Sequence, residues 1–132
     1  MSQVPIARGL AVCENVIIEE RSHNLTLVNC FTVKRSPTFP ASSIRFAVAA
    51  FLSDGDGDIN MTVAVHRLDT MARVYAYSNY VRFSDRMQEV RFLLRIDRCP
   101  FPVPGDYQVS LLAEGEPIAQ QRIRIDAFEE PS

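Results

Sequence analysis

Short runs of apolar and β-branched residues recur along the chain, separated by turn residues at intervals of about ten positions. This spacing is typical of an all-β domain. No segment keeps apolar residues at helical spacing for about ten positions, so we expect no helix longer than a turn. The pattern predicts eight strands, near residues 9–20, 24–34, 43–53, 59–67, 72–83, 88–97, 106–113 and 117–126.

Two of these runs show how strands are covered. From Val90 to Ile96 apolar residues occupy every second position, with Leu93 as the one break, which predicts one buried and one solvated face. The run from Ile44 to Leu52 is apolar on both faces. We therefore expect this strand to lie centrally in its sheet, covered on both sides.

The connections between strands are of two kinds. Three are short, around Ser22, at residues 53–58 and at Glu114-Gly115, and the last two contain the glycine that hairpin turns favour. Two are longer and contain prolines, at residues 36–40 and 99–105, and these predict crossings between sheets. The prediction is a two-sheet antiparallel sandwich. One sheet would hold the strands at 9–20, 24–34 and 88–97, and the other those at 43–53, 59–67, 106–113 and 117–126.

The last hairpin predicts a β-bulge. A two-residue turn at Glu114-Gly115 places Ile118 on the face of Leu111. Strict alternation then turns Ile123 and Ile125 to the opposite face. An extra residue around positions 119–121 would bring all three isoleucines to the core.

This arrangement resembles an immunoglobulin-like or fibronectin-like sandwich over nearly the whole chain. Tyr107 follows Pro104-Gly105-Asp106 at the start of the penultimate strand. Such sandwiches often place a tyrosine there, whose hydroxyl bonds back to the chain. The chain has no tryptophan and no cysteine pair at the inter-sheet positions, so the resemblance is to the architecture.

Several short motifs also resemble an uncharacterised bacterial family of short β-sandwich proteins. The resemblance implies a cytoplasmic bacterial setting, and it supplies no reaction and no catalytic residues. The motifs are Cys13-Glu14 leading into Ile18-Glu19, Leu25-Thr26-Leu27-Val28-Asn29, Phe39-Pro40, and Phe101-Pro102 followed by Pro104-Gly105-x-Tyr107-x-Val109-x-Leu111-Leu112.

Length and composition fit one domain over residues 1–132, with an ordered core of about 8–127 and a loose tail at 129–132. The 14 basic and 16 acidic residues nearly balance, so we expect no nucleic-acid partner. No apolar stretch approaches the roughly 20 residues of a membrane helix, and the N-terminus does not resemble a signal peptide. We therefore expect a cytoplasmic protein without a membrane partner.

The cysteines Cys13, Cys30 and Cys99 are odd in number and show no CxxC spacing. This predicts buried free thiols in a reducing compartment. A short turn near residues 21–24 would, however, set Cys13 and Cys30 nearly opposite each other, which leaves an oxidised pair as the alternative. A cysteine acting with His66 in catalysis is the most distant of the functional hypotheses.

Charged residues offer a few further candidates. Asp54, Asp56 and Asp58 resemble the opening of a calcium loop, but Ile59 and Val65 stand where its glycine and glutamate belong. A solvated turn is therefore favoured, and a ligand- or calcium-binding domain using this loop is the alternative. We expect Glu14 to form a structural charge pair with an arginine, and we predict no metal, cofactor or catalytic site. Solubilising charge on two different sheets is expected of Arg91, Arg95, Arg122 and Arg124.

Tyr75, Tyr77 and Tyr80 cluster with Arg73 and Arg82 in the segment at 72–83. Aromatic residues with arginine are typical of protein interfaces, but also of sandwich cores, and the sequence leaves both open. An open sandwich also has edge strands that invite strand addition or dimerisation. The prediction is a non-enzymatic interaction module that binds a protein partner, or forms a homodimer, through an edge strand or this segment.

Overall fold

The computed structural model describes residues 2–41 and 44–128, so the predicted loose tail at 129–132 lies outside the described residues. Within the described ranges the chain forms nine strands and no helix, and therefore no helix that could span a membrane. The strands are β1 (Ile6–Ile18), β2 (Leu25–Cys30), β3 (Val33–Ser36), β4 (Phe46–Ser53), β5 (Gly57–Arg67), β6 (Arg73–Phe83), β7 (Val90–Ile96), β8 (Gly105–Ala113) and β9 (Glu116–Ala127).

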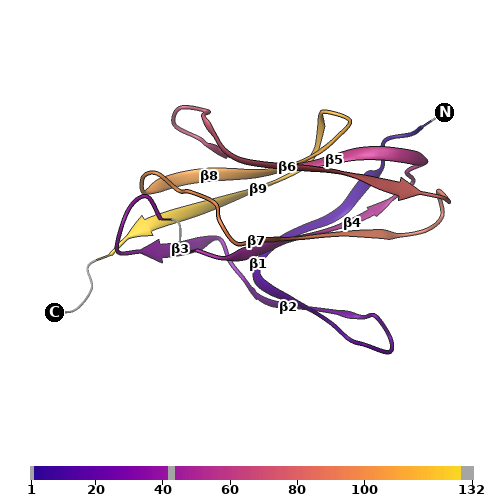
Figure 1. The fold of residues 1–132 in the computed structure, drawn as a ribbon, viewed down its shortest axis with the longest axis horizontal. Helices are drawn as coiled ribbons and strands as arrows, with labels where there is room; N and C mark the ends of the chain where they lie inside the picture. The colour runs from indigo at the N-terminus through magenta and orange to yellow at the C-terminus, as the bar shows by residue number, and fades with distance from the viewer. Residues whose placement is uncertain (1, 42–43, 129–132) are drawn as a thin grey trace.

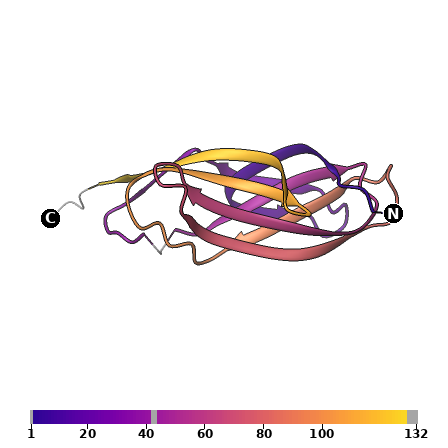
Figure 2. The same cartoon turned by 90° about the horizontal axis from the view of Figure 1, so that it is seen from above.

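Two sheets pack face to face (Figure 1). One has the order β2-β1-β4-β7, and the other has the order β3-β9-β8-β5-β6. The inner faces of both sheets meet in one apolar core. Its largest fully buried side chains include Tyr107, Phe83 and Phe101. Figure 2 shows β6 at one margin of the five-stranded sheet.

Strand β4 lies in the other sheet from the one predicted. The structure pairs it with β1 on one side and β7 on the other. Residues 53–58, which were predicted to form a hairpin turn, therefore carry the chain from one sheet to the other. The residues that favour tight turns are still used there, since Asp54 and Gly57 both have positive φ, 63° and 85°. The turn-forming residues predicted that the chain reverses direction here, but not which sheet the next strand joins.

The predicted strand at 24–34 is two strands. β2 pairs antiparallel with β1, and β3 pairs parallel with β9 in the opposite sheet. The chain changes sheet near Phe31, whose ring packs edge-on against Phe46 at 6.3 Å. The proline-containing connections at 36–40 and 99–105 then link strands of different sheets, as predicted.

Strand β4 is covered on both faces, which confirms the expectation for a strand that is apolar on both. Its inner face joins the main core. On its outer face Ala47 and Ala49 belong to a second buried cluster with Cys13 and Val16 of β1. Partly buried leucines close this cluster, namely Leu25, Leu27 and Leu93. The four-stranded sheet curls, so that the β1–β2 hairpin lies over the outer face of β4 and β7 (Figure 1).

Two arginines of β7 hold the hairpin in this position. Arg91 Nη1 donates to the backbone oxygen of His23 at 2.6 Å, and Arg95 Nη2 donates to that of Val16 at 2.7 Å. Both arginines face outward, as predicted, and they also bond to the hairpin backbone, a role that the alternation did not indicate. The alternation of side chains along β7 directs both arginines to the outer face of the four-stranded sheet. The curled hairpin brings backbone oxygens to that same face.

The predicted β-bulge is present in the β8–β9 hairpin. Leu111 pairs with Ala119, whereas the next residue, Leu112, pairs with Pro117, so that Ile118 is the extra residue. The bulge lies one position before the predicted range. Its effect is the one expected, because Ile123 and Ile125 are almost completely buried.

The second cluster gives a prediction about packing. Ala49→Leu inserts three carbon atoms where the hairpin covers β4, and overpacking of a closed core costs about 1–3 kcal/mol of unfolding free energy. The matched control is Ala76→Leu on exposed β6, which we expect to change stability by no more than about 0.5 kcal/mol. Urea denaturation followed by circular dichroism measures both. Equal effects would show that the hairpin does not cover β4.

Candidate functional site

Strand β6 is an edge strand. It pairs antiparallel with β5 from Phe83 opposite Gly57 to Arg73 opposite His66, and within the described residues no strand pairs with its other side. The backbone N–H of Tyr80 donates to the side-chain oxygen of Asn79 at 2.9 Å, so its partner is a neighbouring residue of β6 and not another strand. The free side of β6 is therefore a row of backbone groups that another strand can pair with.

The three tyrosines of β6 do not share one environment. Tyr75 is partly buried and packs against the main core, and burial raises the pKa of its hydroxyl. Tyr77 is 41% exposed and Tyr80 is 69% exposed. Tyr77 pairs with core-facing Val63, whereas Tyr80 pairs with Asn60 on the opposite face. The question that the sequence left open therefore has two answers: Tyr75 belongs to the core, and Tyr77 and Tyr80 belong to the surface.

β6 is also the least protected of the four edge strands that the described residues form. It is 11 residues long, and its stretch from Val74 to Val81 contains no charge and no proline. The edge strand β3 has four residues, two of them charged, and β7 carries Arg91 and Arg95. β2 is uncharged but short, and Asn29 breaks its extended backbone with a φ of 52°. Natural proteins protect edges by short length, charge and irregular backbone, and β6 has these features only near its ends.

Two aspartates of the loop at residues 54–58 contact other side chains of this chain. Asp54 accepts hydrogen bonds from Ser53 at 2.8 Å and from Arg8 at 2.9 Å, and these contacts lower the pKa of its carboxyl. Asp58 pairs with Arg82 at 3.3 Å. In the part of the chain that the structure describes, no three His, Cys, Asp or Glu side chains lie close enough together to hold a metal ion. Asp54 thus joins the β4–β5 connection to β1, and Asp58 joins β5 to β6, rather than both converging on one point.

Cys13 and Cys99 show no sign of activation by a histidine. Cys99 is fully buried, and burial raises its pKa to about 12. Cys13 is also buried, and its thiol donates to the backbone oxygen of Ala47 at 3.8 Å. His66 lies on β5 between Gln108 and Arg73 in the sheet. A nucleophilic cysteine needs a lowered pKa and a base in reach, and these two thiols have raised pKa values.

Glu14 forms the structural charge pair that the sequence predicted, but with a different partner and in a more exposed position. Its carboxylate accepts hydrogen bonds from Asn29 at 2.6 Å and from Lys34, and these lower its pKa. No arginine is involved. The pair links β1 to β3 at the point where the chain leaves the first sheet.

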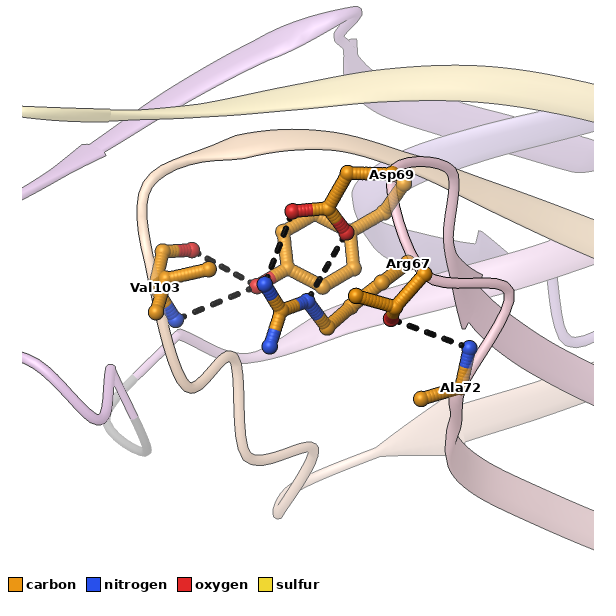
Figure 3. Close-up of polar contacts among 6 residues, drawn as sticks. Arg67, Asp69, Ala72 and Val103 are labelled. Atoms are coloured by element: carbon orange, nitrogen blue, oxygen red, sulfur yellow. Dashed lines mark hydrogen bonds and ion pairs between the residues drawn. The ribbon is translucent and has the colours of Figure 1, made fainter.

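A pocket of about 390 Å³ lies at the end of the sandwich where the β5–β6 turn faces the β7–β8 connection. Arg67 forms two hydrogen bonds with Asp69, at 3.0 and 2.8 Å (Figure 3). Arg124 pairs with Asp126 at 2.7 Å and with Asp106 at 3.4 Å. Both arginines are thus neutralised by carboxylates of this chain. The pocket offers no free charge for an anion.

Tyr107 closes this end of the core. Its ring is buried against Phe101, and its hydroxyl donates to the backbone oxygen of Val103 at 2.6 Å and accepts from the N–H of Val103 at 3.3 Å. Burial raises the pKa of this hydroxyl. The bond back to the chain is the one that the sequence predicted for Tyr107. The pocket is therefore built around a structural tyrosine.

The fold and its surface define a two-sheet all-β domain with one long open edge. The chain belongs to DUF6941, a family of unknown function, whose profile matches residues 8–126. This agrees with the resemblance to an uncharacterised family. No curated protein matches the chain.

Among solved structures, the chain is similar to part of the Pseudomonas fluorescens alkylpurine DNA glycosylase AlkC bound to DNA containing an abasic site analog. The likeness has a TM-score of 0.47 and 14% sequence identity, and it covers 71% of this chain and 27% of the glycosylase chain. The chain thus spans about a quarter of that protein's length, and we draw nothing about function from the likeness.

We expect Tyr107→Phe to lower the free energy of unfolding by about 1–3 kcal/mol, because it leaves both backbone groups of Val103 without their partner. The control is Tyr80→Phe on the exposed strand, which should change stability by less than about 0.5 kcal/mol. Circular dichroism follows the urea denaturation of both variants, because the chain has no tryptophan whose fluorescence could follow it. A loss for Tyr107→Phe no larger than that of the control would contradict the role given to this hydroxyl.

Asp54 gives a prediction about pH. Its folded-state pKa is lowered below 3.8, first by Ser53 and then by Arg8, so that ionised Asp54 stabilises the fold above that pH. Asp54→Asn should therefore lower the free energy of unfolding at neutral pH. The difference in unfolding free energy between this variant and the wild type should become smaller as the pH falls below 3.8. Denaturation at several pH values tests this. In an Arg8→Gln background the pH-dependent difference should be smaller, and an unchanged difference would contradict the pairing.

Proposed function

We propose that this domain binds a protein partner through β6, by accepting an extended segment of the partner as an additional strand. The single observation that carries the proposal is the long, uncharged free edge from Val74 to Val81. Strand addition supplies affinity through backbone hydrogen bonds. Natural proteins leave such an edge open at the risk of aggregation, so an open edge that persists calls for a partner.

The side chains of β6 supply the specificity. An added strand would pass beside Tyr77 on one face and Tyr80 on the other, so that each ring can pack against alternate side chains of the partner. Tyrosine contributes strongly to interfaces because it buries a large ring at a small cost in conformational entropy. The two ends of the strand carry Arg73 and Arg82. Arg82 is already paired with Asp58, so the partner segment that fits best is apolar at its centre, with an acidic residue facing Arg73.

A second copy of the chain can use the same edge, which is the homodimer alternative. Because the edge is uncharged at its centre, two copies can approach without repulsion between like charges. Sedimentation velocity over a range of protein concentrations distinguishes the two cases. If the protein is monomeric at all concentrations, the edge is left for another protein to bind. If it forms a dimer that Tyr80→Lys dissociates, the edge binds a second copy of the chain.

The proposal places the domain among non-enzymatic modules of the bacterial cytoplasm with an immunoglobulin-like architecture. Support for the architecture comes from Tyr107, whose hydroxyl bonds back to Val103 as in the tyrosine corner of such sandwiches. Support for a non-enzymatic role comes from the raised pKa values of Cys13 and Cys99. The three cysteines, which form no disulfide here, suit a reducing compartment.

The test is an affinity capture from lysate of the source cell, with quantitative mass spectrometry. A single protein should be recovered in near-stoichiometric amount. Tyr80→Lys should abolish its recovery, because the change places a charge in the open edge. Tyr77→Ala with Tyr80→Ala should weaken the purified complex by at least about thirtyfold in Kd, which corresponds to about 2 kcal/mol.

The matched control is Thr26→Lys, which places the same charge on the other uncharged edge strand, β2. The partner should still be recovered with this variant. Loss of the partner with Thr26→Lys and its retention with Tyr80→Lys would move the binding surface to the β1–β2 hairpin and overturn the proposal.

A further inference from the structure

Cys13 and Cys30 are direct partners across the β1–β2 ladder. The neighbouring pair is hydrogen bonded, since the N–H of Phe31 donates to the oxygen of Val12 at 3.1 Å. In an antiparallel ladder hydrogen-bonded and non-hydrogen-bonded pairs alternate, so Cys13 and Cys30 form a non-hydrogen-bonded pair, a kind whose Cα atoms typically lie about 4.5 Å apart. This separation lies within the range of about 4.4–6.8 Å that a disulfide needs.

The two thiols differ in access to solvent. Cys30 is exposed, whereas Cys13 is fully buried in the second cluster beneath the hairpin. Burial and the nearby thiol of Cys30 raise the pKa of Cys13. An incoming reagent therefore meets Cys30 first, and Cys13 lies directly across the ladder from it. Cys99 is buried in the main core and takes no part in this pair.

We propose that Cys13 and Cys30 form a redox site, in which exposed Cys30 is attacked first and buried Cys13 resolves the product into a disulfide. The oxidant is a small-molecule disulfide. The Cys30 thiolate attacks one sulfur of the oxidant and releases the other half as a thiol, which leaves a mixed disulfide on Cys30. Cys13 attacks the Cys30 sulfur, and the departing second half takes up the Cys13 proton and leaves as a thiol. Two electrons pass from the protein dithiol to the oxidant, which leaves as two thiols.

The disulfide would close the hairpin that covers β4. β1 and β2 separate from the rest of the sheet just beyond this pair, and the hairpin beyond it lies over Ala47 and Ala49. A covalent bond at its base fixes the two strands in register. The site is independent of β6, so that the two proposals succeed or fail separately.

The test treats the folded wild-type protein with oxidised glutathione at mildly alkaline pH and reads the intact mass and the cross-linked peptides. The wild type and Cys99→Ala should each lose two hydrogen atoms and yield a Cys13–Cys30 peptide. Cys30→Ala should remain unchanged, and Cys13→Ala should accumulate glutathione on Cys30. The oxidised wild type should melt about 5–10 °C higher than the reduced protein.

Two results would overturn the proposal. One is a wild type that keeps glutathione on Cys30 while Cys13 stays free. The other is a Cys13–Cys30 bond that forms only after denaturation. Both can be read from the wild-type protein alone, so the conclusion does not depend on any variant that fails to fold.

Discussion

Burial of both faces of β4 is the constraint on which the rest of the structure depends. A strand with Phe46, Val48 and Ala50 on one face and Ala47 and Ala49 on the other must be covered twice. The second sheet covers one face. The chain covers the other by curling its own first sheet, so that the β1–β2 hairpin folds over the outside. Small alanines leave room for it, and Arg91 and Arg95 bond to its backbone.

The same arrangement determines which edges of the sheets stay open. Curling one sheet accounts for the hairpin and leaves four edge strands among the described residues. Three of them are short, charged or broken by an irregular residue. The fourth, β6, is long and uncharged from Val74 to Val81, and in the described part of the chain no strand pairs with its other side. The candidate binding surface is thus a consequence of how the core is covered.

Much of the local structure could be predicted from the sequence, and less of the assembly. Alternation located the strands, the register of Ile118 with Ile123 and Ile125 required a bulge, and the position of Tyr107 indicated its bond to the backbone. The sheet of β4 was assigned wrongly because turn residues predict a reversal and not the sheet that receives the chain. β3 was missed because the apolar run continues past Asn29, whose tolerance of positive φ was the available signal.

The candidate site, too, could be predicted only where it depends on nearby residues of the sequence. Composition drew attention to Tyr75, Tyr77 and Tyr80, but their exposure depends on which strands flank β6. That fact comes from pairings between residues far apart in the sequence. The roles of Arg91 and Arg95 were equally beyond prediction, because their partners lie on a hairpin that reaches them only when the sheet curls.

Amide hydrogen exchange across β6, measured with and without the captured partner, tests the central claim most directly. In the free protein the amides of β6 that point away from β5 should exchange quickly, while those bonded to β5 exchange slowly. Binding should slow the fast set and leave β2, β3 and β7 unchanged. Slower exchange confined to one of those other edges, with β6 unaffected, would contradict the account.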